Sequence, residues 1–183
     1  MDIARRIIAE EGVGALSIRR ITKEMDYSAG IVYHYFKSKD EIVVCVLREN
    51  YQKIMDAIKT KSENLSPDEE IRTAIMSYIE TALQWPNEYR AIMLDSSPQI
   101  LAFTSMLGNN ETRPALTEMV SILDKGVEDG MFAPCDTQIT ARAIWSAMFG
   151  LLIRLIVEED VPQEQRAALI ERQTDLILKG LKP

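Results

Sequence analysis

The sequence of 183 residues predicts an all-α fold. Three observations support this prediction. Apolar residues recur three and four positions apart along most of the chain, which is the spacing of one face of a helix. Ser, Asp, Pro and Gly residues stand where these patterns begin and end. A sustained alternation of polar and apolar residues, the pattern of a half-buried strand, is absent from the sequence.

Two short helices joined by a tight turn are predicted within residues 17–36. The first begins after Ser17, whose side chain can cap a helix N-terminus. Ile18, Ile21 and Met25 fall three and four residues apart and therefore line one face, with basic residues on the other. The next three residues, Asp-Tyr-Ser, break the helix because Asp and Ser favour turns and caps.

The second of these helices, residues 29–36, has the features of a helix that enters the major groove of DNA. Val32 and Phe36 point inward, and the small residues at the leading end allow a close approach to base edges. Tyr and His side chains can donate to phosphates, whereas Tyr35 is expected to be partly buried. The predicted DNA contacts are Ser17, Arg19, Arg20, Ser28, Ala29, Gly30, Tyr33, His34, Lys37 and Lys39.

The distribution of charge agrees with a local contact to nucleic acid. The formal net charge of the chain is −7. Residues 1–50 contain 8 basic and 8 acidic residues, whereas residues 51–183 contain 13 and 20; within residues 17–39 the numbers are 5 and 2. The basic surface is therefore confined to the motif. One motif offers few phosphate contacts, so useful affinity requires a second copy.

The run SAGIVYHYFKSKDE, residues 28–41, resembles the recognition helix and the following helix start of tetracycline-repressor-like (TetR) regulators. An amphipathic segment that ends in Ala9-Glu10-Glu11-Gly12 precedes it, as in that family. The resemblance covers about the first 50 residues. It implies a helix-turn-helix head of three helices, residues 1–45, followed by a helical ligand-binding and dimerisation domain, residues 46–183.

This sequence departs from the pattern of that family at two places. The turn has Asp26 where the family usually has Gly, and Asp can adopt the turn conformation. The reading helix has Ala29 and Ile31 where the family often has Lys and Thr. Two side chains that can form hydrogen bonds are thus replaced by methyl-bearing ones, which could touch thymine methyl groups instead.

Start and stop signals divide the remainder of the chain into further helices. Ser38 and Glu41 form a capping box at the start of a helix that runs to about residue 61. Ser66-Pro67 opens the next one, which ends at Trp85-Pro86. The later helices are predicted at residues 87–95 with Asn87 as cap, 100–107, 112–129 with Gly130 as the stop, 138–157, and from 163 to the C-terminus.

The last two helices are predicted to form a dimer interface. Residues 138–157 are apolar around nearly the whole circumference, so this helix must be buried on two sides. Pairing with the same two helices of a second copy gives a four-helix interface. The alternative is that both helices close the core of the monomer. The predicted interface residues are Ala143, Ala147, Gly150, Leu169, Ile170, Leu176 and Ile177.

Large and adaptable side chains between the head and these helices are candidates for a ligand pocket. The chain contains nine methionines, and surfaces rich in Met suit variable apolar ligands, although the same spacing also fits an ordinary core. The predicted ligand contacts are Met55, Met76, Ile79, Trp85, Met93, Phe103, Met106, Met119, Trp145, Met148 and Phe149. Tyr78, Gln84, Arg90 and Asp95 are candidate polar anchors.

Several classes of function are disfavoured by the sequence. Cys45 and Cys135 are expected to be reduced thiols in a cytoplasmic protein. With a single histidine, His34, and no paired cysteines, neither a metal site nor a cofactor is expected. No nucleophile and orienting carboxylate accompany that histidine, so catalysis is not expected. The apolar stretch 143–153 is too short to span a bilayer, and no membrane association is predicted.

The sequence therefore predicts a homodimeric transcriptional regulator, most simply a repressor. It would bind a near-palindromic double-stranded operator and be released by a small apolar effector through a shift in conformational population. Two other classes remain open: a protein-interaction adaptor on the same scaffold, and a small helical enzyme acting on a hydrophobic substrate. A gel shift distinguishes the adaptor, and the lack of a paired acid and base argues against the enzyme.

Overall fold

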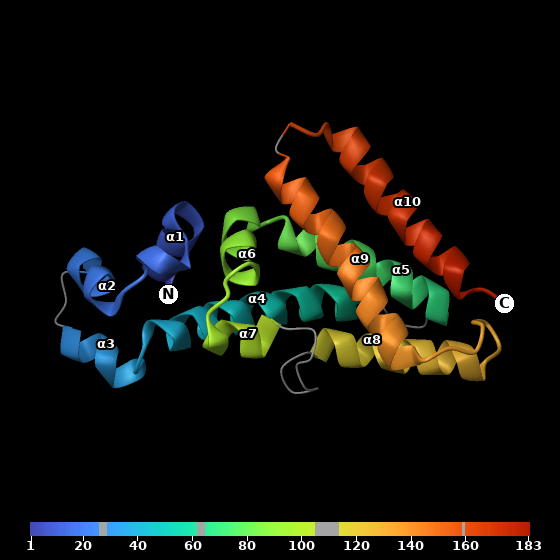
Figure 1. Cartoon of the computed structure of the whole chain (residues 1–183), viewed down its shortest axis with the longest axis horizontal. Helices are drawn as coiled ribbons and strands as arrows, with labels where there is room; N and C mark the ends of the chain where they lie inside the picture. Colours follow the sequence, from blue (N-terminus) through green and yellow to red (C-terminus); the bar gives the residue numbers. More distant parts are fainter. Residues whose placement is uncertain (26–28, 62–64, 105–113, 159) are drawn as a thin grey trace. The chain divides into compact units, whose positions relative to one another are not determined.

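The computed structural model describes residues 1–25, 29–61, 65–104, 114–158 and 160–183, which form helices and no strand. The all-α prediction is confirmed for this part of the chain. Two compact units are present, which can be followed by colour in Figure 1. The first comprises Met1–Lys53 and Gln84–Gly108, and the second comprises Ile54–Leu83 and Asn109–Pro183. The functional boundary predicted after residue 45 stays a prediction.

The first unit is built on the N-terminal helices. Its elements are α1 (Asp2–Glu11), the 3-10 turn η1 (Val13–Ala15), α2 (Ile18–Met25), α3 (Ala29–Tyr35), the first part of α4 (Lys39–Lys61), α6 (Pro86–Met93) and α7 (Pro98–Thr104). Helix α1 packs against α6, η1 and α2, and α2 packs against α3. Ile7, Ile8, Leu16 and Ile42 are fully buried in this unit. Two helices from later in the sequence thus complete the N-terminal core.

Local signals fix the helix ends in this unit. Helix α1 stops at Gly12, whose φ of +84° is a conformation that favours glycine. Ser38 Oγ accepts the N–H of Glu41 at 3.2 Å, and the Glu41 carboxylate accepts the N–H of Lys37 at 2.6 Å. The predicted capping box of α4 is therefore present, except that the Glu41 carboxylate binds the N–H of Lys37 instead of the N–H of Ser38.

Two helices begin earlier than the sequence predicted. Helix α6 starts at Pro86 rather than after Asn87, and α7 starts at Pro98 rather than Ile100. Proline is well tolerated at the first position of a helix because the N–H it lacks would have no partner there. The two prolines thus open helices. The predicted helical residues 105–107 and 112–113 lie outside the described part of the chain.

A buried polar network joins α1, α4 and α6 within the first unit. The Glu88 carboxylate, 5% exposed, accepts hydrogen bonds from the Arg5 guanidinium at 2.7 Å and from the Asn50 amide. Arg5 also donates to Oδ1 of Asn50 at 2.8 Å and forms an ion pair with Glu49. Burial raises the pKa of Glu88, while its bond to Asn50 and the charge of Arg5 act in the opposite direction. One carboxylate therefore holds three helices together.

The second unit is a bundle. It consists of the end of α4, α5 (Pro67–Ala82), α8 (Pro114–Glu128), α9 (Thr137–Val157) and α10 (Gln163–Leu181). Helix α5 packs against α8, α9 and α10, and α9 also packs against α8 and α10. The C-terminal end is fixed by the N–H of Ala133, which donates to the carbonyl of Leu181 at 2.8 Å, and by an ion pair of 3.0 Å between Lys182 and Asp68.

Two glycines shape the end of α8 and the turn that follows it. Gly130, the predicted stop, has a φ of +68°. The N–H groups of Met131 and Phe132 both donate to the carbonyl of Gly126 at 2.9 Å. The buried Phe132 ring lies so close that a Cβ on residue 126 would be 2.1 Å from it. Only glycine fits this position without movement of the ring.

Helix α9 is longer than the apolar stretch counted in the sequence. It has 21 residues, and its most apolar window has a mean hydropathy of 1.5, so by length and composition it could cross a membrane. The core helix of a soluble protein passes the same test. Here α9 packs against three other helices of the second unit, and 33% of that window is buried. The other residues of α9 are half-buried or exposed.

The Glu88 network gives a prediction for stability. Glu88→Ala should lower the free energy of unfolding by about 2 kcal/mol, because Arg5 and Asn50 lose a shared acceptor. Glu88→Gln retains an acceptor oxygen and should lose less. Burial raises the folded-state pKa of Glu88 above its ordinary value of 4.5. The folded state then binds the proton more tightly than the unfolded state.

The stabilising contribution from this protonation is therefore full below pH 4.5 and is lost as the pH rises through the folded-state pKa. Wild type should lose stability relative to Glu88→Gln over that range. Urea unfolding of both proteins at a series of pH values measures the difference. If the difference in unfolding free energy between the two proteins does not change with pH, the pKa of Glu88 is not raised in the folded state.

Candidate nucleic-acid interface

Helix α2 is held to the first unit by its apolar face. Ser17 Oγ accepts an N–H of the first turn at 3.2 Å, which confirms the predicted cap. Ile18 and Ile21 are each 6% exposed, as expected. Met25, predicted on the same face, is 39% exposed, and Thr22 is buried instead, where its hydroxyl donates to a carbonyl of its own helix. The buried face of α2 thus ends one turn earlier than predicted.

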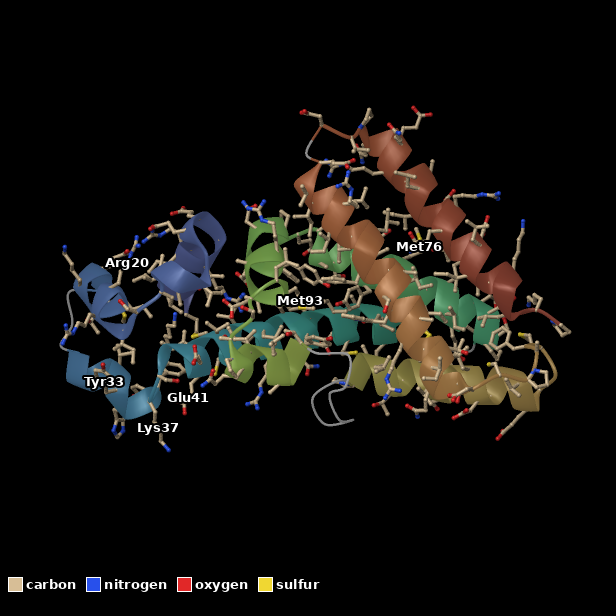
Figure 2. All side chains as sticks on the ribbon, viewed as in Figure 1. Arg20, Tyr33, Lys37, Glu41, Met76 and Met93 are labelled. Atoms are coloured by element: carbon tan, nitrogen blue, oxygen red, sulfur yellow. The ribbon has the colours of Figure 1, made fainter. Side chains whose placement is uncertain are left out.

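Helix α3 has an inner edge and a broad exposed face. Val32 is 7% exposed and Phe36 is half-buried, in agreement with the prediction. Tyr33, labelled in Figure 2, is 54% exposed. Tyr35 is 71% exposed, so the expectation that it is partly buried is wrong. Its ring meets that of His34 edge-on, with centroids 5.3 Å apart, and His34 is also exposed.

Three basic residues predicted to contact DNA have different surroundings. Arg19 and Lys37 are exposed, and Lys37 is labelled in Figure 2. Lys39 is half-buried, and its Nζ donates to the carbonyl of Val13 at 3.4 Å. Lys39 therefore ties the start of α4 to η1. Ser28 and the side chain of Ala29, also predicted contacts, lie outside the described residues.

The guanidinium of Arg20 forms ion pairs with two carboxylates. Its guanidinium forms a two-pronged pair with Glu11, in which Nη1 is 2.6 Å from Oε2, and its Nε lies 3.4 Å from Glu24. The bond from Arg20 lowers the pKa of Glu11. Arg6 also pairs with Glu24. Arg20 thus joins α1 to α2, and a phosphate could be bound only in competition with these two acidic residues. These acidic partners were not predicted from the sequence.

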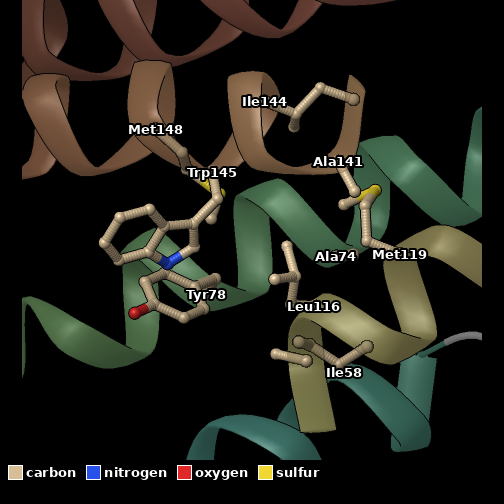
Figure 3. A pocket seen from close by; sticks show the side chains of 10 residues that line it. Ile58, Ala74, Tyr78, Leu116, Met119, Ala141, Ile144, Trp145 and Met148 are labelled. Atoms are coloured by element: carbon tan, nitrogen blue, oxygen red, sulfur yellow. The ribbon is translucent and has the colours of Figure 1, made fainter. Parts of the chain in front are cut away.

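The second unit contains a small apolar pocket, shown in Figure 3. Its lining comes from α4, α5, α8 and α9 and consists of Ile58, Ala74, Tyr78, Ala115, Leu116, Met119, Ala141, Ile144, Trp145 and Met148. The pocket leaves about 30 Å³ for the centres of water-sized spheres, which is room for a water molecule or two. A larger ligand can enter only if side chains move.

Three predicted ligand contacts, Met119, Trp145 and Met148, line this pocket. Tyr78, named as a polar anchor, is also in the lining and is 2% exposed. Phe149 stacks on Trp145, with ring centroids 5.1 Å apart and planes 9° apart. Sequence reasoning missed the alanines of the lining because they leave space rather than fill it. Their spacing from the large residues, as with Ala141 and Trp145, was the available signal.

The other predicted ligand contacts lie elsewhere. Met55 and Ile79 are buried in the second unit and Met76 is half-buried there, outside the pocket lining. Trp85 and Met93 belong to the first unit, as do the anchors Gln84, Arg90 and Asp95. Figure 2 labels Met76 and Met93. The side chain of Phe103 and all of Met106 lie outside the described residues. Helical spacing identified buried residues here but not the space they enclose.

The predicted dimer residues are divided between exposed and buried positions. Those that are exposed or half-buried are Ala143, Ala147, Gly150, Leu169, Leu176 and Ile177. Ile170, by contrast, is 6% exposed and lies in the core with Thr174 and Leu178. It is therefore unavailable to a second copy and is removed from the predicted interface. Ile139 and Val157, which are 59% and 49% exposed on α9, were not predicted.

Residues 1–45 match the family model described as bacterial regulatory proteins of the tetR family. The HTH-type transcriptional repressor KstR2 of Mycolicibacterium smegmatis is 28% identical over 156 residues, which cover 79% of this chain and 71% of that protein. Three further bacterial HTH-type regulators are 25–31% identical, and there the chain spans 38–48% of the relative's length.

Solved structures share the fold over nearly the whole chain. FadR from Bacillus subtilis in complex with stearoyl-CoA has a TM-score of 0.81 at 19% identity, covering 98% of this chain and 96% of that one. KstR2 of Mycobacterium tuberculosis, a ketosteroid transcriptional regulator, has a TM-score of 0.66 at 19% identity, covering 100% and 92%. The residues matched by the family model include α2, α3 and the start of α4. Residues 1–45 are therefore a DNA-binding domain of the tetR type, and the chain is a DNA-binding transcriptional regulator.

Proposed function

We propose that the chain is a homodimeric repressor that acts in the cytoplasm. Helix α3 of each copy enters the major groove of a near-palindromic operator, and a small apolar molecule releases the dimer. The observation that carries this proposal is the exposed face of α3, which combines a glycine with solvent-facing aromatic side chains in the segment that the family model matches. Such a face permits contact with base edges and phosphates.

The DNA contact is tested at the glycine of α3. Gly30 is exposed, so Gly30→Leu should fold normally, yet its side chain would hold α3 away from the base edges. Operator affinity should fall by at least about tenfold. The measurement is fluorescence anisotropy with DNA from upstream of the chain's own gene.

Ala102→Leu, which adds similar bulk to an exposed position of α7, is the matched control and should bind as wild type does. Circular dichroism confirms that both variants are folded. If Gly30→Leu binds the operator as tightly as wild type, the groove assignment is wrong.

The proposed dimer interface is the exposed surface of α9 and α10. Small residues at positions 143, 147 and 150 share one face of α9, so another helix can approach closely. On the neighbouring α10, Leu169 and Leu176 are 42% and 56% exposed, which leaves two adjacent apolar faces uncovered in one copy. Exposed apolar surface of this kind is typical of contact sites between subunits.

Gly150→Arg is expected to yield monomers. Apart from the adjacent residues and the nearby backbone of α9, no atom of the described residues lies within 4 Å of a Cβ added at this glycine, so the substitution should spare the monomer. In the dimer, however, a charge would be forced into a close contact between helices. Ser121→Arg on the exposed side of α8 is the control. Sedimentation velocity should detect dimers for wild type and the control only; an unchanged Gly150→Arg dimer would exclude this surface.

The apolar pocket of the second unit is the proposed effector site. Its lining is almost entirely apolar, and Met119 and Met148 can adopt several shapes. A similar structure, that of FadR, was solved with stearoyl-CoA, and another similar protein is a ketosteroid regulator. An acyl-CoA, whose acyl chain is apolar, and a steroid are the first probes. An effector that prefers the opened pocket shifts the population away from the DNA-binding state by the ratio of its affinities for the two states.

Filling the pocket should separate effector response from DNA binding. Ala115 is half-buried at the lining, and Ala115→Phe would occupy the space that an effector needs. The concentration of stearoyl-CoA or steroid needed for operator release should rise by at least about tenfold, since the binding site is blocked. Affinity for the operator without effector should stay unchanged. Ser121→Phe, outside the lining, is the control; an identical response in Ala115→Phe would place the effector elsewhere.

A further inference from the structure

Helix α3 lacks the side chains that usually read bases through paired hydrogen bonds. Its sequence, AGIVYHY, contains no Arg, Lys, Asn, Gln, Asp or Glu. Arg and Lys are the usual partners of guanine, and Asn and Gln those of adenine. The hydrogen-bonding side chains of α3 are those of Tyr33, His34 and Tyr35. Much of the base preference of this helix must therefore arise from another kind of contact.

Ile31 is an exposed apolar residue on the outer face of this helix. Its exposure is 46%, whereas the next residue, Val32, is 7% exposed and marks the inner face. With 3.6 residues per turn, Ile31 shares the outer face with His34, three positions later, and lies beside Gly30. Because Gly30 has no side chain, the backbone there can come close to base edges. Ile31 is thus positioned where α3 comes nearest to the floor of the groove.

The tyrosines flank this face on both sides. Tyr33 and Tyr35 are separated by two positions, about 200° around the helix, and both are more than half exposed. They lie at the two edges of the surface that contains Ile31 and His34, where hydroxyl groups can donate to the phosphates of either wall. Within this surface His34 lies midway between the tyrosines, and Ile31 lies between His34 and Tyr35, on the side that faces away from Val32.

We propose that Ile31 contacts the C5-methyl group of a thymine in each half-site of the operator and gives the regulator a preference for thymine there. The inference rests on the proposed DNA function. The thymine methyl is the apolar group that the base edges present in the major groove. Contact between it and Ile31 removes apolar surface of both molecules from water, which is favourable.

The test uses the thymine methyl group itself. Wild-type protein first selects its preferred sequence from random double-stranded DNA. Each thymine of the selected sequence is then replaced with uracil, which removes the methyl group and keeps the base-pairing groups. At one position in each half-site, wild type should lose roughly fourfold in affinity, the value expected for one buried methyl group. Other thymines should show little effect.

Substitution of Ile31 identifies the residue responsible. In Ile31→Ala the loss caused by uracil at that position should disappear, because the side chain no longer reaches the methyl group. Ile31→Val retains a branched side chain and should keep most of the loss. Leu94→Ala, which changes another exposed apolar residue of the first unit, should keep all of it. Thermal melts check that every variant is folded.

Two outcomes would overturn the inference. In the first, wild type binds every uracil-containing DNA as tightly as the thymine form; in the second, the loss persists unchanged in Ile31→Ala. Both leave DNA binding intact and reject only the methyl contact. If wild type selects no sequence at all, the proposed function itself fails, and the thymine contact fails with it.

Discussion

Glu88 places an acidic side chain where three helices of the first unit meet. A carboxylate removed from water is costly unless its oxygens accept strong hydrogen bonds. Arg5 and Asn50 provide these from α1 and α4, and Arg5 is 83 positions from Glu88 in the sequence. Helix α6 can therefore occupy its position only when α1 and α4 occupy theirs. The structural unit that presents α3 is for this reason larger than the N-terminal motif.

The electrostatics of this unit follow from pairs formed within it. Arg20 of the motif and Arg6 of α1 are positively charged, but both are paired with carboxylates of α1 and α2. These ion pairs link α1 to α2, and the paired carboxylates offset the positive charge that the two arginines would otherwise present to phosphate. Arg19, Lys23 and Lys37 are exposed cations on α2 and just after α3. The attraction for phosphate from one copy is consequently modest, and this fits a protein that binds DNA in pairs.

Local features of the chain were predictable, and those that depend on distant contacts were not. Ser17 and Ser38 cap helices as predicted because capping involves only the next three residues. The link from Arg5 to Glu88 had no local signal. Spacing alone could not distinguish the two apolar faces of α10, so Ile170 was assigned to the wrong one. The buried methionines were recognised, but whether a Met borders a cavity depends on its neighbours in space.

At the candidate DNA-contact site, too, local features were predictable and features that depend on distant contacts were not. The inward positions of Val32 and Phe36 follow from helical spacing, and the structure agrees. The exposure of Tyr35 does not follow from spacing, because it depends on what the other helices leave uncovered. The pairing of Arg20 with Glu11 likewise depends on how α1 and α2 meet. A count of basic residues in the motif therefore overstates the charge that is available to phosphate.

The small size of the pocket has a consequence for how such a regulator would sense its environment. A cavity that holds a water molecule or two must open before a larger molecule enters, and the free energy of opening is subtracted from the intrinsic affinity. The threshold concentration is then set by packing as well as by ligand chemistry. A change of side-chain volume that loosens α8 against α9 would make the response more sensitive without touching the effector. Substitutions in an ordinary hydrophobic core could thus adjust the effector concentration at which the regulator responds.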